Sequence, residues 1–167
     1  LNECFSGKKA TFMILGNVCT RACAFCSTGK GDEVNPPDTG EPQRIADCAK
    51  LLSLRYVIAT SVARDDLDDG GARQFVKVAE FVKRSLPDAV IELLIPDFAG
   101  NKDSIRAVTS CGADIIGHNI ETVKRLYPIV RSNADYLRSL NILKFIKEIR
   151  PEILTKSSII AGLGETE

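Results

Sequence analysis

Several features that would point to a charged partner or to a membrane are missing from this 167-residue sequence. It carries no net charge, because 22 acidic side chains balance 22 basic ones, so its composition does not indicate a nucleic-acid partner. No apolar run approaches the roughly 20 residues that a membrane-spanning helix needs, and the opening segment, LNECFSGKKA, lacks the apolar core of a secretory signal. We therefore expect a soluble protein that binds neither nucleic acid nor membrane.

Tryptophan is also absent, and histidine occurs once, at His118, whereas 44% of the residues are hydrophobic. That apolar content suffices for one domain with a buried core but hardly for two, so we expect residues 1–167 to form a single domain. The sequence begins without methionine and stops at GLGETE, directly after an apolar segment. We therefore expect the chain to be a piece of a longer protein.

Short apolar segments alternate with segments of helical period along the chain. The expected strands are residues 11–15, 56–62, 90–96, 114–119 and 157–163. The expected helices are residues 45–52, 75–82, 102–110, 121–126 and 142–149. Gly112 is expected to cap the third helix and Pro128 to stop the fourth. The alternation predicts an α/β fold with a parallel sheet, either doubly wound or barrel-like.

Polar and glycine-rich stretches follow four of the expected strands. They are GNVCTRACAFC, ARDDLDDGG, PDFAG and HNIET, in chain order. The carboxyl ends of parallel strands lie at the same edge of a sheet, and in a βα barrel that edge carries the active site. The chemistry of the protein is therefore expected at these four stretches.

Six cysteines occur in the chain, and three of them lie within eight residues, in CTRACAFC. In a chain that has an apolar core, such a cluster binds metal more often than it forms disulfides. A structural zinc site needs four protein ligands. A 4Fe-4S cluster held by three thiolates instead keeps one iron open for another ligand. The spacing favours the iron-sulfur cluster. The alternatives are a zinc site of three cysteines and His118, and thiols that are structural or unligated.

Other residues that carry reactive groups have simpler interpretations. Cys48 lies on the apolar stripe of an expected helix, where a free thiol packs as a small hydrophobe. Cys111 has no companion cysteine and is expected to be an unligated thiol. A lone histidine usually makes local hydrogen bonds, which we expect of His118.

Cys19, Cys23 and Cys26, with the aromatic Phe25 before the last cysteine, resemble the C-x3-C-x-aromatic-C motif of the radical S-adenosylmethionine (SAM) enzymes. Neighbouring sequence segments narrow the resemblance to the lipoyl synthase family. They are ATFMILGNVCTRACAFC, YVIATSVARDDLDDGGA, IELLIPDF, HNIETVKRLY, ADYLRSL and TKSSIIAGLGETE. The resemblance implies a partial (β/α) TIM-type barrel of about five βα units. A biotin synthase-like enzyme and a non-catalytic zinc or metal-binding scaffold are the alternatives.

The resemblance also implies roles for individual residues. Cys19, Cys23 and Cys26 would hold a 4Fe-4S cluster whose open iron binds SAM, with Phe25 beside the adenine, and no catalytic residue is assigned beyond this cluster. Cys4 matches one cysteine of the family's second, auxiliary 4Fe-4S cluster, which makes residues 1–10 a remnant of that segment. The residues expected to bind SAM are Ser61, Gly70, Gly71, Asn119, Glu121, Arg131, Lys156, Gly162 and Glu165.

The reaction implied by the resemblance is the insertion of two sulfurs into an octanoyl chain, which becomes the lipoyl group. Its partners would be an octanoylated lipoyl carrier domain, such as an E2 subunit or the glycine cleavage H protein, and an electron donor. The location would be cytoplasmic in a bacterium and mitochondrial or plastidial in a eukaryote. Because the auxiliary site is incomplete in this sequence, we expect the chain to be inactive alone.

Overall fold

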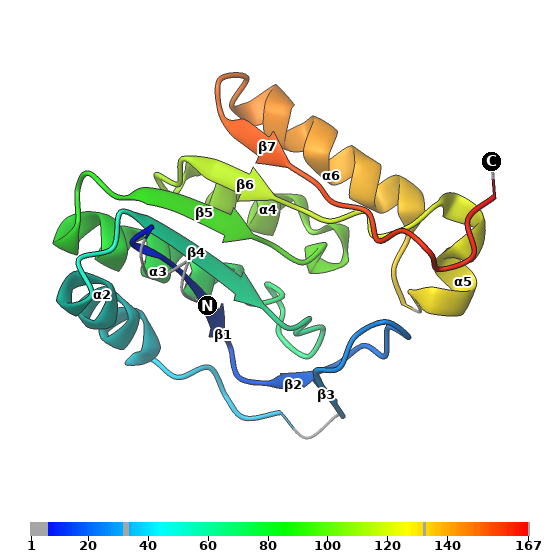
Figure 1. The fold of residues 1–167 in the computed structure, drawn as a ribbon, viewed down its shortest axis with the longest axis horizontal. Helices are drawn as coiled ribbons and strands as arrows, with labels where there is room; N and C mark the ends of the chain where they lie inside the picture. Colours follow the sequence, from blue (N-terminus) through cyan, green and yellow to red (C-terminus); the bar gives the residue numbers. More distant parts are fainter. Residues whose placement is uncertain (1–6, 32–33, 132, 167) are drawn as a thin grey trace.

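The architecture is an open sheet of five parallel strands in the order β1-β4-β5-β6-β7 (Figure 1). The computed structural model describes residues 7–31, 34–131 and 133–166. The strands are β1 (Lys9–Ile14), β4 (Tyr56–Ser61), β5 (Val90–Leu94), β6 (Ile115–Gly117) and β7 (Leu154–Lys156). β1 and β7 are the two edges of this sheet, so the barrel is partial and the expected fold class is confirmed.

Four long helices connect consecutive strands and lie on one side of the sheet (Figure 1). They are α2 (Glu41–Leu51), α3 (Ala72–Ser85), α4 (Lys102–Ser110) and α6 (Tyr136–Ile149). Each contacts the next along the sheet, α2 with α3, α3 with α4 and α4 with α6. Four of the five expected helices are thereby confirmed. Within the described ranges, no helix has the length and apolar character needed to cross a membrane.

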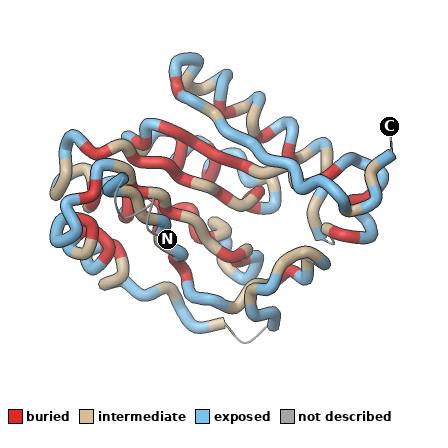
Figure 2. The backbone as a smooth tube through the Cα atoms, in the orientation of Figure 1, coloured by how far each residue is buried: buried red, intermediate tan, exposed pale blue. Residues whose placement is uncertain are grey.

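The hydrophobic core lies between the sheet and these helices. Val57, Ala59, Ile91 and Leu93 are fully buried on the strands, and Phe75 of α3 is fully buried among them. Successive strand residues point to opposite faces, and the residues between the buried ones in β4 are only half-buried. Figure 2 shows the buried residues concentrated along the central strands and along the helix faces that meet them. Helices therefore cover one face of the sheet.

The fifth strand was predicted too late in the chain. β7 ends at Lys156, and residues 157–163 make an isolated bridge, Ile159 with Glu121, instead of a strand. β6 has only three residues, and all three pair with β7. The apolar pair of residues at 159–160 resembled a buried strand, yet Ile159 is 61% exposed.

The helix predicted at 121–126 was also wrong in detail. The chain forms a 3-10 turn, η2 (Lys124–Leu126), followed by a short helix, α5 (Tyr127–Val130). Pro128 lies in the first turn of α5 and does not stop a helix there. Proline suits that position because the first turn of a helix does not use its amide hydrogen atoms in internal hydrogen bonds.

Candidate active site

The three clustered cysteines lie on a loop that follows β1 and is closed at its base by two short strands. β2 (Val18–Cys19) pairs in parallel with β3 (Gly29–Lys30), and the amide of Gly31 donates to the carbonyl oxygen of Cys19 over 3.2 Å. Gly29 is required at this closure, because a Cβ atom there would lie 2.9 Å from the carbonyl oxygen of Asn17. The ladder gives the cysteine loop, residues 19–28, a fixed base.

Backbone hydrogen bonds attach the cysteine loop to the carboxyl ends of the strands. The Thr20 amide donates to the carbonyl oxygen of Ala63, just beyond β4, over 3.1 Å, and the Ala24 amide donates to that of Val130 in α5 over 2.9 Å. Figure 1 shows β2, β3 and α5 at the side of the molecule toward which the strand arrows point. The loop therefore lies at the edge of the sheet where the polar stretches were expected.

Arg21 makes the strongest side-chain attachment of the loop. Its guanidinium donates from Nε and Nη2 to the two carboxylate oxygens of Asp65, each over 2.6 Å, and from Nη2 to Asp97 over 2.6 Å. Arg138 of α6 donates to the other oxygen of Asp97 over 3.1 Å. Burial alone would lower the pKa of Arg21, but its bonds to Asp65 and Asp97 raise that pKa above the ordinary value. Arg21 is therefore always charged.

Asp97 is the buried end of this network. Its side chain is 0% exposed, and its carboxylate also accepts the amide of Ala99 over 3.0 Å. Burial would raise the pKa of Asp97, but the hydrogen bond and the charge of Arg21 bring it below the usual value. The carboxylate is consequently ionised at neutral pH.

Cys19, Cys23 and Cys26 line one cavity of about 280 Å³, together with Phe25 and residues from the ends of β4 and β5. All three are free thiols and half-buried. The Arg21 amide donates to Cys19 Sγ over 3.4 Å, and Cys26 Sγ donates to Thr28 Oγ1 over 3.2 Å. Burial raises the pKa of Cys23, while the positive charge of Arg131 opposes that increase.

The donor set fits a 4Fe-4S cluster better than a single metal ion. Three soft sulfur donors face one cavity, and thiolates are the ligands that iron-sulfur clusters prefer. Among the described residues, no group of three histidine, cysteine or acidic side chains could hold one metal ion. Cysteines of a cubane bind different irons, so they need not meet at a single point.

Four of the residues expected to bind SAM also line this cavity: Ser61, Asn119, Glu121 and Arg131. The Arg131 guanidinium donates to the Tyr127 hydroxyl over 2.7 Å, which holds it at the cavity wall. The backbone of Glu121 is paired on both sides, because its amide donates to Ser158 and its carbonyl oxygen accepts from Ile160. The expected SAM-binding residues at this cavity thus include one acidic residue, Glu121, and one basic residue, Arg131.

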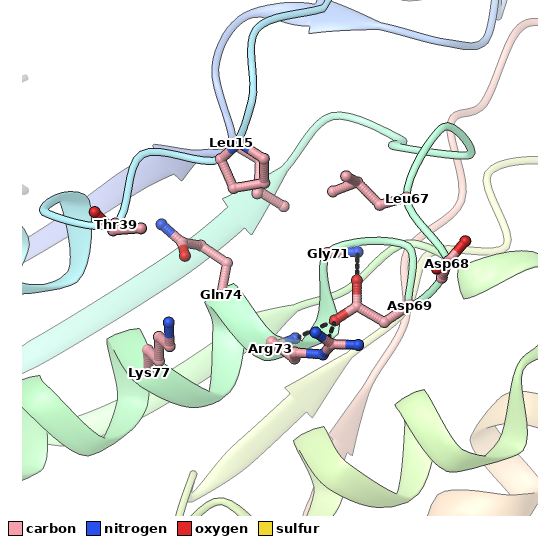
Figure 3. Close-up of a pocket in the computed structure, with 10 residues that line it drawn as sticks. Leu15, Thr39, Leu67, Asp68, Asp69, Gly71, Arg73, Gln74 and Lys77 are labelled. Atoms are coloured by element: carbon pink, nitrogen blue, oxygen red, sulfur yellow. Dashed lines mark hydrogen bonds and ion pairs between the residues drawn. The ribbon is translucent and has the colours of Figure 1, made fainter.

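Gly70 and Gly71, two of the three glycines expected at this site, lie elsewhere. Gly70 packs beside Phe98 of η1 (Phe98–Gly100), and Gly71 precedes α3 with a φ of +89°. Figure 3 shows Gly71 in a separate pocket near Leu15 and Asp69. The Gly71 amide donates to Asp69 Oδ1 over 2.9 Å, so it is already engaged. These glycines shape the backbone before α3 and do not line the cysteine cavity.

Lys156, Gly162 and Glu165 are likewise not among the residues that line the cysteine cavity. Lys156 donates to both carboxylate oxygens of Glu92, over 2.7 and 2.9 Å. Glu165 accepts from the Gly162 amide over 2.9 Å and from the Thr122 hydroxyl over 3.1 Å. These three residues therefore stabilise β7 and the segment after it.

His118 is completely buried, and both ring nitrogens have partners. Nδ1 lies 3.0 Å from the carbonyl oxygen of Ile95 and Nε2 lies 3.0 Å from Ser139 Oγ, while burial lowers the pKa of the imidazole. The expected local hydrogen bonding is confirmed, which leaves no ring nitrogen for zinc in this arrangement. Cys4, the residue matched to the auxiliary cluster, lies outside the described residues.

Arg21 and Asp97 line the cavity but were missed by sequence reasoning. Arg21 stands inside the cysteine motif, between Cys19 and Cys23, and Asp97 belongs to PDFAG, one of the polar stretches that follow the strands. The sequence does not show that the two meet, because they are 76 residues apart. Only the parallel order of the strands brings them together.

Comparison with known proteins connects this geometry with a family. The model of the radical SAM superfamily matches residues 13–167. The chain belongs to the radical SAM superfamily. Membership implies a 4Fe-4S cluster that works with SAM, in agreement with the three cysteines and the cavity that they line.

Two bacterial relatives illustrate where this radical SAM chain stands. It is 54% identical over 167 residues to a lipoyl synthase of Caldanaerobacter subterraneus subsp. tengcongensis, covering 100% of this chain and 58% of the relative. It is 52% identical over 165 residues to a lipoyl synthase of Aquifex aeolicus, covering 99% and 59%. The chain thus spans somewhat more than half the length of these relatives.

A solved structure of methylornithine synthase has the same fold as this radical SAM chain. The TM-score is 0.70 at 19% sequence identity, and the match covers 92% of this chain and 45% of the other. At that identity the likeness concerns the fold alone. It agrees with the partial barrel seen in the open sheet.

Proposed function

We propose that the chain is part of a lipoyl synthase, in which it forms the radical-generating barrel. The observation that carries the proposal is the cavity shared by Cys19, Cys23, Cys26 and Phe25. The identity of about half the residues to lipoyl synthases supports this specific enzyme over other radical SAM enzymes. The substrate would be an octanoyl chain on a lipoyl carrier domain, and the product the lipoyl group.

In this proposal Cys19, Cys23 and Cys26 hold the 4Fe-4S cluster at the carboxyl edge of the sheet. When bound, the cluster and SAM supply a deoxyadenosyl radical that abstracts hydrogen from the octanoyl chain. The protein binds and orients the cosubstrate and keeps water away from it. Phe25 provides an aromatic face for the adenine.

The charged residues of the cavity suit the zwitterionic end of SAM. Arg131 would bind the carboxylate and Glu121 the ammonium group, a proposal supported by their position in the lining of the cavity beside the cysteines. Ser61 and Asn119 add neutral polar groups that can bind the ribose hydroxyls. Gly70, Gly71, Lys156, Gly162 and Glu165 would act only indirectly, through the backbone segments that they stabilise.

The rest of the enzyme is proposed on the resemblance alone. Residues 1–167 would form one radical SAM domain, and Cys4 within residues 1–10 would belong to the segment that holds an auxiliary 4Fe-4S cluster, the sulfur donor. An E2 subunit or the glycine cleavage H protein would carry the octanoyl chain, and a separate electron donor would reduce the cluster. The bacterial relatives support a cytoplasmic location.

The test is anaerobic reconstitution of the chain with iron and sulfide, followed by iron analysis and electron paramagnetic resonance with and without SAM. A 4Fe-4S signal that changes on addition of SAM is the expected result. Cys23→Ser should abolish that signal, whereas Cys48→Ser, a half-buried cysteine on α2, should leave it intact. Bound zinc without an iron signal would contradict the proposal and favour the metal-binding scaffold.

A second assay addresses the reaction itself. The chain alone, given octanoylated carrier, SAM and reductant, is expected to form no lipoyl product, because Cys4 is the single residue here that matches the auxiliary cluster. Mass spectrometry of the carrier detects the two added sulfurs. Lipoylated carrier would show that the auxiliary site is dispensable, and sulfur added to dethiobiotin would favour the biotin synthase-like alternative.

A further inference from the structure

We propose that Arg21 is a positioning residue for the cysteine loop, with Asp65 and Asp97 as its anchors. Arg21 stands between Cys19 and Cys23, the first two sulfur donors. The inference rests on the proposed function, because it concerns the loop that would carry the radical-generating cluster. It assigns to Arg21 a role toward the protein and not toward the reacting atoms.

The first support is the way in which Arg21 is paired. It reaches two carboxylates from different strand ends, Asp65 after β4 and Asp97 after β5, through three bonds of 2.6 Å. The Arg21 side chain is 7% exposed. A buried guanidinium is tolerated only while its partners stay in place, so the paired state selects one position of the loop.

The second support is the attachment of Asp97 to the remainder of the fold. Arg138 of α6 and the Ala99 amide both donate to its carboxylate, independently of Arg21. The anchor is therefore fixed by α6 and η1 before the loop binds to it. Because Asp97 is held in place by the barrel, it fixes the position of the cysteine loop relative to the barrel.

The third support is the short path from Arg21 to the sulfur atoms. Its own amide donates to Cys19 Sγ over 3.4 Å, so displacement of the Arg21 backbone removes a hydrogen bond to the first ligand. Hydrogen bonds to cluster sulfurs are among the determinants of iron-sulfur reduction potentials. Release of Arg21 is thus expected to affect the loop cysteines in particular.

The competing interpretation is that Arg21 binds an anionic ligand directly, since it also lines the cavity. Its Nε and Nη2 atoms already donate to carboxylates. Arg131, whose guanidinium is held by the Tyr127 hydroxyl and not by a carboxylate in the described structure, is better suited to that purpose. The two interpretations predict different behaviour of the metal-free protein.

The experiment measures thiol accessibility in the metal-free 167-residue chain. Iodoacetamide labels the cysteines under anaerobic conditions, and peptide mass spectrometry gives the rate at each one. The variants are Arg21→Gln, Arg21→Lys and Asp65→Asn. Arg106→Gln, which breaks an exposed arginine–aspartate pair with Asp103 on α4, is the matched control.

Arg21→Gln is expected to speed labelling of the three loop cysteines at least about tenfold, as loss of one charged hydrogen bond would allow. Cys48 and Cys111 should keep their rates, and Arg106→Gln should change no rate. Loss of the Arg21 charge by itself would act in the opposite direction, because that charge lowers the pKa of Cys23. Arg21→Lys should recover part of the protection.

The proposal would be overturned if the loop cysteines were labelled at the same rate in Arg21→Gln and in the unsubstituted chain. If Arg21→Gln speeds labelling of Cys48 and Cys111 as well, that variant has unfolded. The test of the proposal is then Asp65→Asn, because Asp65 is the more exposed of the two anchors. A rise confined to the loop then supports positioning, and an unchanged loop rate overturns it. Because the protein contains no metal in this assay, the result is independent of whether the unsubstituted chain takes up a cluster.

Discussion

Replacing Gly71 with alanine is expected to lower the free energy of unfolding by about 2–4 kcal/mol. Gly71 has a φ of +89°, where an L-residue costs about 1 kcal/mol. The new Cβ atom would also overlap Cδ1 of Leu15, which is 5% exposed and packed in the core. Overpacking of such a core side chain adds roughly 1–3 kcal/mol.

Gly112 provides a matched control for this substitution. Its φ is +86°, and an added Cβ atom would have nothing within 4 Å. Gly112→Ala should therefore cost about 1 kcal/mol, from the backbone conformation alone. The difference between the two variants isolates the clash with Leu15.

Urea unfolding of the metal-free chain, followed by circular dichroism, measures both free energies. Equal losses in the two variants would refute the reasoning, because they would mean that Leu15 moves aside at no cost. SAM binding to the reconstituted protein adds a second readout. If Gly71→Ala kept its stability but lost SAM binding, Gly71 would be a binding residue, as the sequence resemblance implied.

Two further predictions concern Phe75 in the core and Tyr56 of β4. Phe75→Ala should cost about 3–5 kcal/mol in the same urea assay, because Phe75 is fully buried and packs edge-on against Phe98 at 6.1 Å; a loss below 1 kcal/mol would contradict the packing. Burial and the hydrogen bond to Glu92 raise the pKa of Tyr56 to about 12. Between about pH 10 and pH 12 the folded state therefore keeps a proton that the unfolded state releases. The contribution of Tyr56 to the free energy of unfolding should decline as the pH rises through this range. Tyr56→Phe should remove the decline, and an unchanged alkaline profile in that variant would argue against the assignment.

Four of the five helices and the first four strands could be predicted because each has a local signal in the sequence, a helical period or a short apolar run. Residues 102–110 coincide with α4, where the side chain of Asn101 accepts from the amides of Asp103 and Ser104 and Gly112 follows the helix. The strand at 157–163 could not be placed, because its position depends on β6, which offers three residues for pairing. The apolar character of residues 159–160 does not by itself reveal that Ile159 is exposed.

In the site, too, features within one short segment could be predicted, whereas contacts between distant segments could not. The three cysteines and Phe25 form a motif within one short segment of sequence, and all four residues line one cavity in the structure. Gly71 and Lys156 also follow or end strands, yet they contact Asp69 and Glu92 and do not line that cavity. Strand-end position predicts the edge of the sheet at which a residue lies, whereas the direction of each side chain is set by packing.

The attachments of the cysteine loop imply an order of events during biosynthesis. The loop lies near the beginning of the sequence, but Asp65 and Asp97 follow Arg21 by 44 and 76 residues, and the carbonyl group that receives the Ala24 amide belongs to α5. The thiols therefore leave the ribosome well before the residues that arrange them. Cluster insertion into a correctly shaped loop would wait until most of the barrel has been synthesised, and until then three free thiols would need protection from oxidation and from the wrong metals.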